Sequence, residues 1–146
     1  MSGVSTPALR DVRLSWVRAL CVAGGAAAAV IVWTIEVPLL GVRLSIRFGA
    51  MHPQTVAAGQ VAGAALVAAL LGWLLLTSLE RRTPRPRAAW TGAALLVLVI
   101  SLALPLVAAT TVSAAVGLIA LHLAVGAVVI PGMSHTARPH LPLGSG

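Results

Sequence analysis

The sequence has few charged and few aromatic residues. Of its 146 residues, 9% are charged and 3% are aromatic, and neither lysine nor tyrosine occurs. Soluble domains carry roughly 25% charged residues, so this chain has too few charges to cover a surface that faces water. An ordinary soluble domain is therefore excluded.

The single cysteine and the three acidic residues limit the chemistry available to the chain. Cys21 alone excludes an intrachain disulfide and a cysteine-based metal or redox centre. Asp11, Glu36 and Glu80 lie at or beyond the ends of the apolar runs, so no carboxylate is expected in the middle of a membrane. The sequence also lacks a nucleophile-and-base pair, a glycine-rich phosphate loop and a group of metal ligands. We therefore expect no enzymatic activity, no cofactor and no metal site.

Long apolar runs are abundant, since 59% of the residues are hydrophobic and the mean hydropathy is +1.01. A helix needs about 20 residues to cross about 30 Å of hydrocarbon. Runs close to this length occupy residues 19–35, 56–79, 88–107 and 112–130. They predict an all-α membrane protein in which residues 19–130 form an antiparallel bundle of four transmembrane helices.

Two tails are predicted outside the bundle. Residues 1–18 hold three arginines ahead of the first run, which also fits a cleaved signal peptide. The apolar sequence continues beyond the small residues 24–29, however, and this favours an uncleaved helix. At the other end, Pro131 and Gly132 are expected to stop the fourth helix. Residues 131–146 are predicted to be disordered, because they are rich in proline, glycine, serine and histidine and have no periodicity.

The positions of the arginines predict the orientation. Eight of the ten lie in the tails or in the loop 80–87, and Arg43 and Arg47 lie in the loop 36–55. Because cytoplasmic loops carry the excess of arginine, both termini and the loop 80–87 are predicted to be cytoplasmic, in the plasma membrane. The net charge of +7 is then an orientation signal and not a nucleic-acid-binding surface. The arginines of the inner loop are also expected to bind anionic lipid: Arg81, Arg82, Arg85 and Arg87.

The outer loop 36–55 has a pattern typical of a strand. Four apolar residues alternate with polar ones: Val42, Leu44, Ile46 and Phe48. A period of two is expected of a half-buried strand, and residues 35–39 are a candidate partner. Because a lone hairpin is marginally stable in water, we predict a small β-hairpin-like element that rests on the helix ends.

Four polar residues on the outer side form the candidate ligand site: Glu36, Arg43, Arg47 and His52. In one interpretation they converge and bind an external anion or another ligand. In the other, Glu36 pairs with an arginine and the arginines contact lipid phosphates.

Three polar residues are predicted to lie within the membrane: Gln60, Ser101 and His122. His122 follows the start of its run by ten residues, about 15 Å at 1.5 Å per residue, and ionisable residues at this depth are functional candidates. The alternative is a structural hydrogen bond to another helix, since neutral imidazole needs only a donor and an acceptor as partners. Pro105 cannot donate to the carbonyl of Ser101, which leaves this carbonyl without its helical partner at a depth similar to that of His122. We therefore expect His122 to contact Ser101.

Gly59 and Gly63 form a GxxxG pattern in the second run. Small residues at this spacing let helix backbones approach closely. The pattern predicts either packing within the bundle or association with a second copy or another membrane protein.

Three segments carry a resemblance to a known family: Trp73–Arg82, Ser101–Pro105 and His122–Gly132. Over residues 15–133, the chain resembles an uncharacterised family of small four-span membrane proteins from high-GC bacteria. The resemblance implies the same four-helix architecture and brings no activity.

We therefore predict an integral membrane protein with a non-enzymatic structural or accessory role. The alternative is a small transport or channel component that uses a polar path through Gln60, Ser101 and His122.

Overall fold

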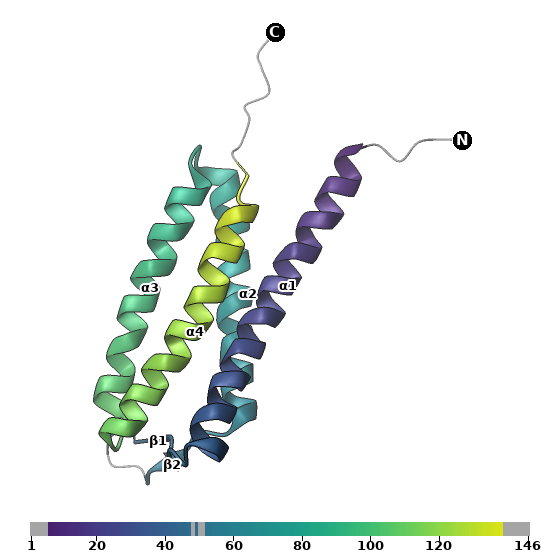
Figure 1. The fold of residues 1–146 in the computed structure, drawn as a ribbon. Coiled ribbons are helices and arrows are strands. Elements are labelled where there is room, and N and C mark those ends of the chain that lie inside the picture. The colour runs from purple at the N-terminus through teal and green to yellow at the C-terminus, as the bar shows by residue number, and fades with distance from the viewer. Residues whose placement is uncertain (1–5, 48, 50–51, 139–146) are drawn as a thin grey trace.

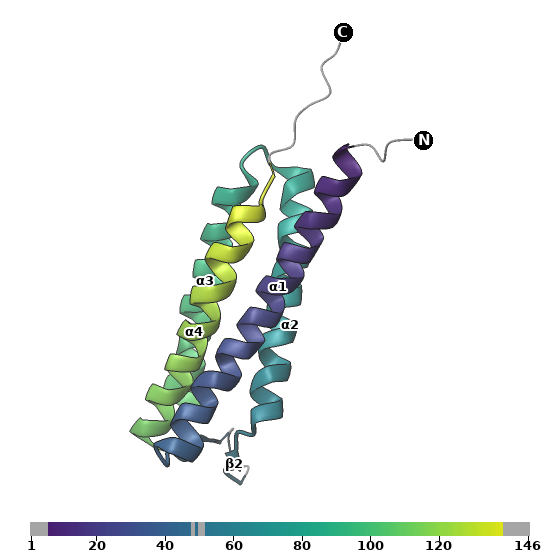
Figure 2. The same ribbon diagram turned by 45° about the vertical axis from the view of Figure 1, so that its right-hand side comes forward.

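The computed structural model describes residues 6–47, 49 and 52–138. Four long helices make up most of this part of the chain: α1 (Thr6–Thr34), α2 (Ala58–Arg82), α3 (Pro86–Ala108) and α4 (Val112–Thr136). They lie side by side and run antiparallel (Figures 1 and 2). Each contributes a segment long and apolar enough to cross a membrane. The predicted four-helix bundle is therefore confirmed.

Helix α4 packs against both α1 and α3, and α1 also packs against α2 (Figure 1). Helices α2 and α3 touch each other much less, although they are consecutive. Two glycines let α1 and α4 approach closely. A Cβ at Gly25 would lie 2.7 Å from Cγ2 of Val129, and a Cβ at Gly132 would lie 2.6 Å from Sγ of Cys21. The α1–α4 pair is thus tightly packed, whereas α2 and α3 leave space between them.

Helix α4 does not end where the sequence predicted. It continues through Pro131 to Thr136, so the prediction of a disordered tail is wrong for residues 131–136. Residues 139–146 of that tail lie outside the described residues. Proline removes one backbone donor, which a helix packed against its neighbours tolerates. The hydroxyl of Ser134 donates to the carbonyl of Pro131 at 2.9 Å, which adds a side-chain bond within the last turns of α4.

Helix α1 begins at Thr6, well before the first apolar run. The segment 1–18, predicted as a tail, is therefore helical from Thr6 onward, and residues 1–5 lie outside the described part. The extension has a local cause, because residues 8–18 contain no glycine or proline and are rich in leucine and arginine, which favour helix.

After the predicted orientation, we call the end of the bundle that holds the loop 36–55 the outer end, and the end at which α1 begins and α4 ends the inner end. At the outer end, α1 passes into one turn of π-helix, η1 (Ile35–Leu39). Pro38 lies inside this turn and has no N–H to donate. The wider turn closes where the N–H of Leu40 donates to the carbonyl of Ile35 at 3.0 Å. These residues are therefore helical, and the suggestion that they form a partner strand is wrong.

The connection between η1 and α2 contains a small antiparallel sheet. Strand β1 (Ser45–Ile46) pairs with β2 (Gln54–Thr55). Ile46 also forms a bridge with Ala109, just after α3. The predicted hairpin-like element is therefore confirmed and rests on the helix ends, while Phe48 of the alternating pattern lies outside the described residues.

Two groups of buried side chains form the core. The inner group consists of Val22, Ala69, Leu76, Trp90, Val129 and Met133. The outer group consists of Ala29, Leu44, Ala65, Leu118 and Leu121. Many other leucines and valines are exposed on the helix faces. Such a surface fits a bundle that is surrounded by lipid rather than by water.

Candidate functional site

A cavity of about 800 Å³ runs between α2 and α3, with α4 as its floor. We call it the lateral groove. Its walls include Ala64 and Ala68 of α2 and Val97 and Leu104 of α3, and all four side chains are exposed. Because its rim is exposed, the groove opens through the side of the bundle, where lipid surrounds a membrane protein.

The inner end of the lateral groove is closed by Trp90. Its ring packs on Gly72, where a Cβ would lie 2.8 Å from Cη2 of Trp90. The indole N–H donates to the carbonyl of Ile130 at 3.4 Å. Strand β2 bounds the groove at the outer end. Between these ends α2 presents mainly alanines, which are too small to fill the space.

His122 lies on the floor of the lateral groove. Its Nδ1 lies 2.7 Å from the carbonyl oxygen of Leu118, one turn earlier in α4. A carbonyl oxygen only accepts, so Nδ1 carries the hydrogen, and in the neutral ring Nε2 is an acceptor. Nε2 forms no hydrogen bond with any of the described residues. The ring therefore presents one uncommitted acceptor.

The expected contact between His122 and Ser101 is not formed. The hydroxyl of Ser101 donates to the carbonyl of Leu98 in its own helix at 2.8 Å. The side-chain oxygen of Gln60 accepts from the N–H of Ala57 at 2.9 Å and caps the start of α2. Each of the three candidates thus bonds within its own helix or at its end. All three nevertheless line the lateral groove, so the structure brings them to one cavity.

Glu36 is buried at the outer end of the bundle, with 9% of its surface exposed. It lies in η1 against α4, where a Cβ at Gly117 would be 3.0 Å from its Oε2. Leu44 packs at the same glycine. Oε2 has no hydrogen-bond partner among the described residues. The glycine is needed here because any side chain would collide with Leu44 and the carboxyl group.

Among the described residues, none of the other outer-loop candidates forms an ion pair with Glu36. Arg43, Arg47 and His52 are exposed. The structure therefore gives no support to the predicted pairing or to a convergent outer site.

Gly59 and Gly63 lie on an exposed face of α2. A Cβ at either position would meet nothing within 4 Å. The GxxxG pattern is therefore not used for packing inside the bundle, and association with another chain stays a prediction.

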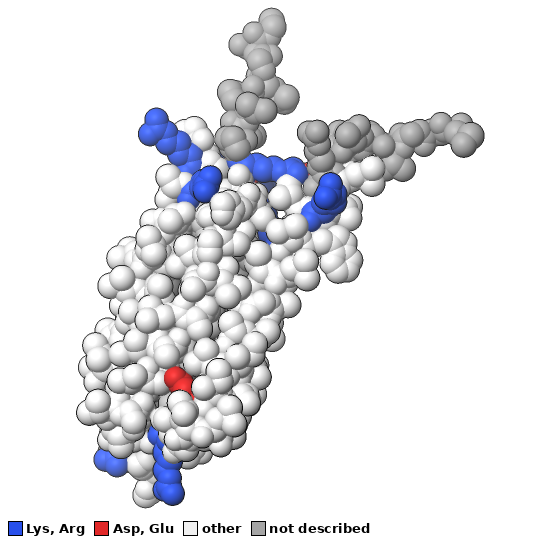
Figure 3. All heavy atoms as spheres, in the orientation of Figure 1, with Lys and Arg blue, Asp and Glu red and all other residues white. Residues whose placement is uncertain are grey.

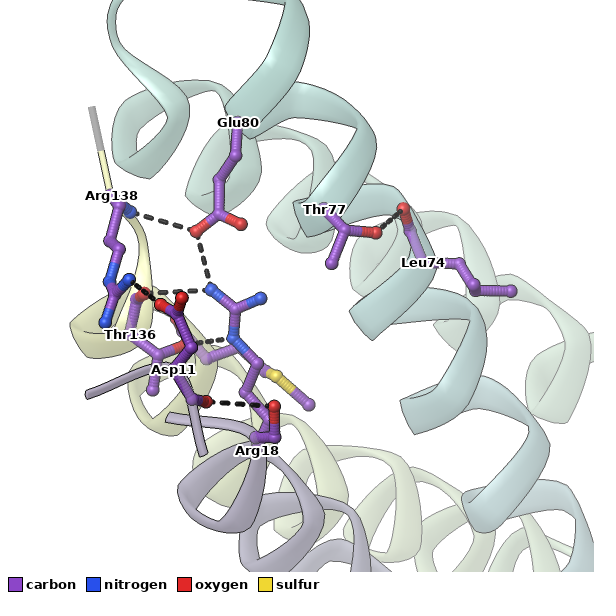
Figure 4. A network of polar contacts seen from close by, with 9 residues as sticks. Asp11, Arg18, Leu74, Thr77, Glu80, Thr136 and Arg138 are labelled. Atoms are coloured by element: carbon purple, nitrogen blue, oxygen red, sulfur yellow. Dashed lines mark hydrogen bonds and ion pairs between the residues drawn. The ribbon is translucent and has the colours of Figure 1, made fainter. Parts of the chain in front are cut away.

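A polar network at the inner end of the bundle was missed by the sequence analysis (Figure 4). Arg18 of α1 is buried, with 7% of its surface exposed. Its guanidinium pairs with Glu80 of α2 at 2.5 Å. It also donates to the hydroxyl of Thr136 at 3.0 Å and to the carbonyl of Thr136 at 2.9 Å. One side chain thus joins three helices.

Arg138 extends this inner network beyond α4. Its backbone N–H donates to Oε1 of Glu80 at 2.9 Å, and its guanidinium pairs with Asp11 at 2.5 Å (Figure 4). The signal in the sequence was the presence of Glu80 at the same end of the bundle as Arg18. The four inner-loop arginines are exposed by contrast: Arg81, Arg82, Arg85 and Arg87.

Residues 10–139 match a family described as "Family of unknown function (DUF6069)". The matched range contains the four long apolar segments, the lateral groove and the inner network. The chain belongs to this family. No curated protein and no solved structure matches the chain significantly.

Membership of DUF6069 assigns no activity. It agrees with the resemblance to an uncharacterised four-span family. The function of this family member must therefore be inferred from the geometry of the lateral groove and of the two ends of the bundle.

Proposed function

We propose that this DUF6069 protein is a multi-pass protein of the plasma membrane with both termini in the cytoplasm. Figure 3 supports a bundle that spans the membrane, because on the face it shows arginines gather at the two ends of the molecule and the long side between them is almost uncharged. The end at which α1 begins and α4 ends carries eight of the ten arginines along the sequence. The positive-inside rule assigns that end to the cytoplasm.

Within the bilayer, the protein acts as a non-enzymatic accessory protein that holds an apolar partner in the lateral groove. The observation that carries this proposal is the sideways opening of an apolar cavity over a tightly packed floor. Pockets of 300–1,000 Å³ are typical of small-molecule sites, and this cavity has about 800 Å³. An enzyme would need several convergent reactive groups, whereas His122 is the one titratable side chain among the residues that line the groove.

A transport or channel component is the second candidate. It is favoured by one observation, that Gln60, Ser101 and His122 line the same cavity. Two features count against a path across the membrane. The serine and the glutamine are bonded to nearby backbone, and Trp90 on Gly72 closes the inner end of the groove.

The accessory function is tested by filling the groove. Ala68→Phe places a large side chain at the rim of the lateral groove, and Ala103→Phe makes the same change on an exposed face of α3 outside the groove. Each variant is purified from native membranes in mild detergent, and bound lipids and proteins are identified by mass spectrometry. We expect Ala68→Phe to lose a molecule that the wild type and Ala103→Phe both retain. Identical bound sets in all three would contradict the proposal.

The transport alternative is tested by the access of water to Ser101. In a Cys21→Ala background, Ser101→Cys introduces one thiol into the groove. A dry groove is expected to protect this thiol from a charged methanethiosulfonate reagent while a membrane-soluble maleimide reacts. Rapid reaction with the charged reagent would favour the transport function instead.

A further inference from the structure

The depth and bonding of His122 define the chemistry of the lateral groove. His122 follows the first residue of α4, Val112, by ten residues in a helix of 25 residues. It therefore lies about 15 Å along a helix of about 37 Å, near the middle of the bilayer. Nδ1 is committed to the carbonyl of Leu118, so Nε2 offers a lone pair to a hydrogen-bond donor. No charged side chain lines the groove.

The length and volume of the groove suit a hydrocarbon chain. Along α2 the lining residues run from Gln60 to Leu75, a length of about 22 Å at 1.5 Å per residue. The volume of about 800 Å³ lies in the range of about 300–1,000 Å³ that is typical of small-molecule sites. The groove can therefore hold an extended alkyl chain that enters from the lipid through its open side.

We propose that the lateral groove binds an uncharged long-chain alcohol from the bilayer, whose hydroxyl donates to Nε2 of His122. This inference rests on the proposed function, in which the groove holds the apolar partner of the protein. The alkyl chain lies against the alanines of α2 and the leucines and valines of α3 and α4. Each buried methylene group favours binding from water by about 0.8 kcal/mol, but bulk lipid offers the same gain, so the hydrogen bond supplies the selectivity.

Depth explains why the ligand is an alcohol and not a phospholipid. The phosphate of a phospholipid stays in the headgroup region, because moving a charge to the bilayer centre is costly. Its donors therefore remain about 15 Å from His122. An uncharged hydroxyl can enter the hydrocarbon, where a hydroxyl without a partner is penalised. Nε2 of His122 removes that penalty within the groove.

The experiment compares an alcohol with its methyl ether, which lacks the hydroxyl that donates a hydrogen bond. The full chain is reconstituted in phosphatidylcholine nanodiscs and labelled with hexadecan-1-ol that carries a diazirine. Unlabelled hexadecan-1-ol and its methyl ether then compete with the label. Because a net hydrogen bond is worth about one factor of ten in affinity, we expect the alcohol to compete at about tenfold lower concentration than the ether. Mass spectrometry is expected to find the label on residues of the lateral groove.

Matched variants assign the preference to one atom. His122→Leu is expected to abolish the tenfold difference and to leave competition by the ether unchanged. His135→Leu makes the same change on an exposed side chain of α4 outside the groove and is expected to preserve it. Size-exclusion profiles and helical circular dichroism check that each variant is folded. The comparison of the two ligands on the wild type needs no variant.

The outcomes separate the inference from the proposed function. Equal competition by alcohol and ether, or a preference that survives in His122→Leu, overturns the inference. If the label then still lies in the groove and Ala68→Phe removes it, the groove still holds the apolar partner. If the label instead spreads over the lipid-facing helices and Ala68→Phe has no effect, both the inference and the proposed function are wrong.

Discussion

Arg18 of α1 and Glu80 of α2 form an ion pair at 2.5 Å, although they are 62 residues apart in the sequence. The exposed fractions of their side chains are 8% and 18%. Arg18 also bonds to the hydroxyl and to the carbonyl of Thr136 at the end of α4. In the sequence Arg18 resembles a charge that merely flanks an apolar run. In the structure it connects the inner ends of α1, α2 and α4.

Removing this arginine should loosen the inner end of the bundle. Removing one partner of a buried ion pair typically lowers the free energy of unfolding by about 3–5 kcal/mol, because the remaining charge stays buried. Since Glu80 is partly exposed and still accepts from the N–H of Arg138, we expect Arg18→Leu to lower the free energy of unfolding by about 3 kcal/mol. The measurement is unfolding in mixed micelles with increasing dodecyl sulfate.

The exposed pair between Arg138 and Asp11 provides the control. Its side chains are 46% and 67% exposed, and surface pairs contribute about 1 kcal/mol or less. Asp11→Asn is therefore expected to change the unfolding free energy by less than about 1 kcal/mol. If the two variants are equally stable, the inner network does not fasten the helices.

Two glycines should respond in opposite ways to the same substitution. A Cβ at Gly25 would lie 2.7 Å from Val129, a stiff and buried side chain, so Gly25→Ala forces α1 away from α4. Overpacking costs about 1–3 kcal/mol, against a gain of up to about 1 kcal/mol from better helix propensity. We expect a net loss of stability in the same micellar unfolding experiment.

Gly63→Ala is the matched case on an open face, because its Cβ would meet nothing within 4 Å. Its stability should stay the same or rise by up to about 1 kcal/mol. A loss of stability in Gly63→Ala together with a change in oligomeric state would reveal that this face packs against another chain.

The bond between His122 and Leu118 predicts a single tautomer of the neutral ring. With ¹⁵N-histidine labelling, the signal of Nδ1 should be that of a protonated nitrogen and the signal of Nε2 that of an unprotonated one. The shift of Nε2 should then move when hexadecan-1-ol is added to the nanodiscs. Finding the hydrogen on Nε2 in the free protein would remove the acceptor on which the ligand assignment depends.

The orientation can be checked with reporter fusions. Alkaline phosphatase fused after Phe48 should be active, because this position is expected on the outer side, and the same reporter fused after Arg82 should be inactive. A green fluorescent protein at these two sites should give the reverse result. Phosphatase activity after Arg82 would mean that the bundle is inserted in the opposite direction.

The four helices were predictable because the thickness of a bilayer sets the length of each span. A span needs about 20 apolar residues, whatever surrounds it, and the four runs satisfied this locally. The end of α4 was not predictable in the same way. Proline and glycine usually end a helix, but here α4 continues through both residues, with Gly132 packed closely on Cys21 of α1.

The sequence predicted which polar residues lie in the candidate site, but not what they contact. His122, Ser101 and Gln60 could be selected as polar residues within apolar runs, and they do line one groove. Their partners could not be selected, because alanine- and leucine-rich helices carry little information about which face turns toward which neighbour. Each of the three bonds locally, so the contact between His122 and Ser101 expected from similar depth does not form.

The scarcity of charge in the sequence by itself determined that the chain has four membrane-compatible helices, because hydropathy and length act one segment at a time. Only the tertiary structure decided which of the few polar groups are used. It buries Arg18 against Glu80 and Thr136, leaves Glu36 against Gly117, and separates α2 from α3 above His122. These relationships depend on the rotation and spacing of whole helices, which small residues and close packing set jointly.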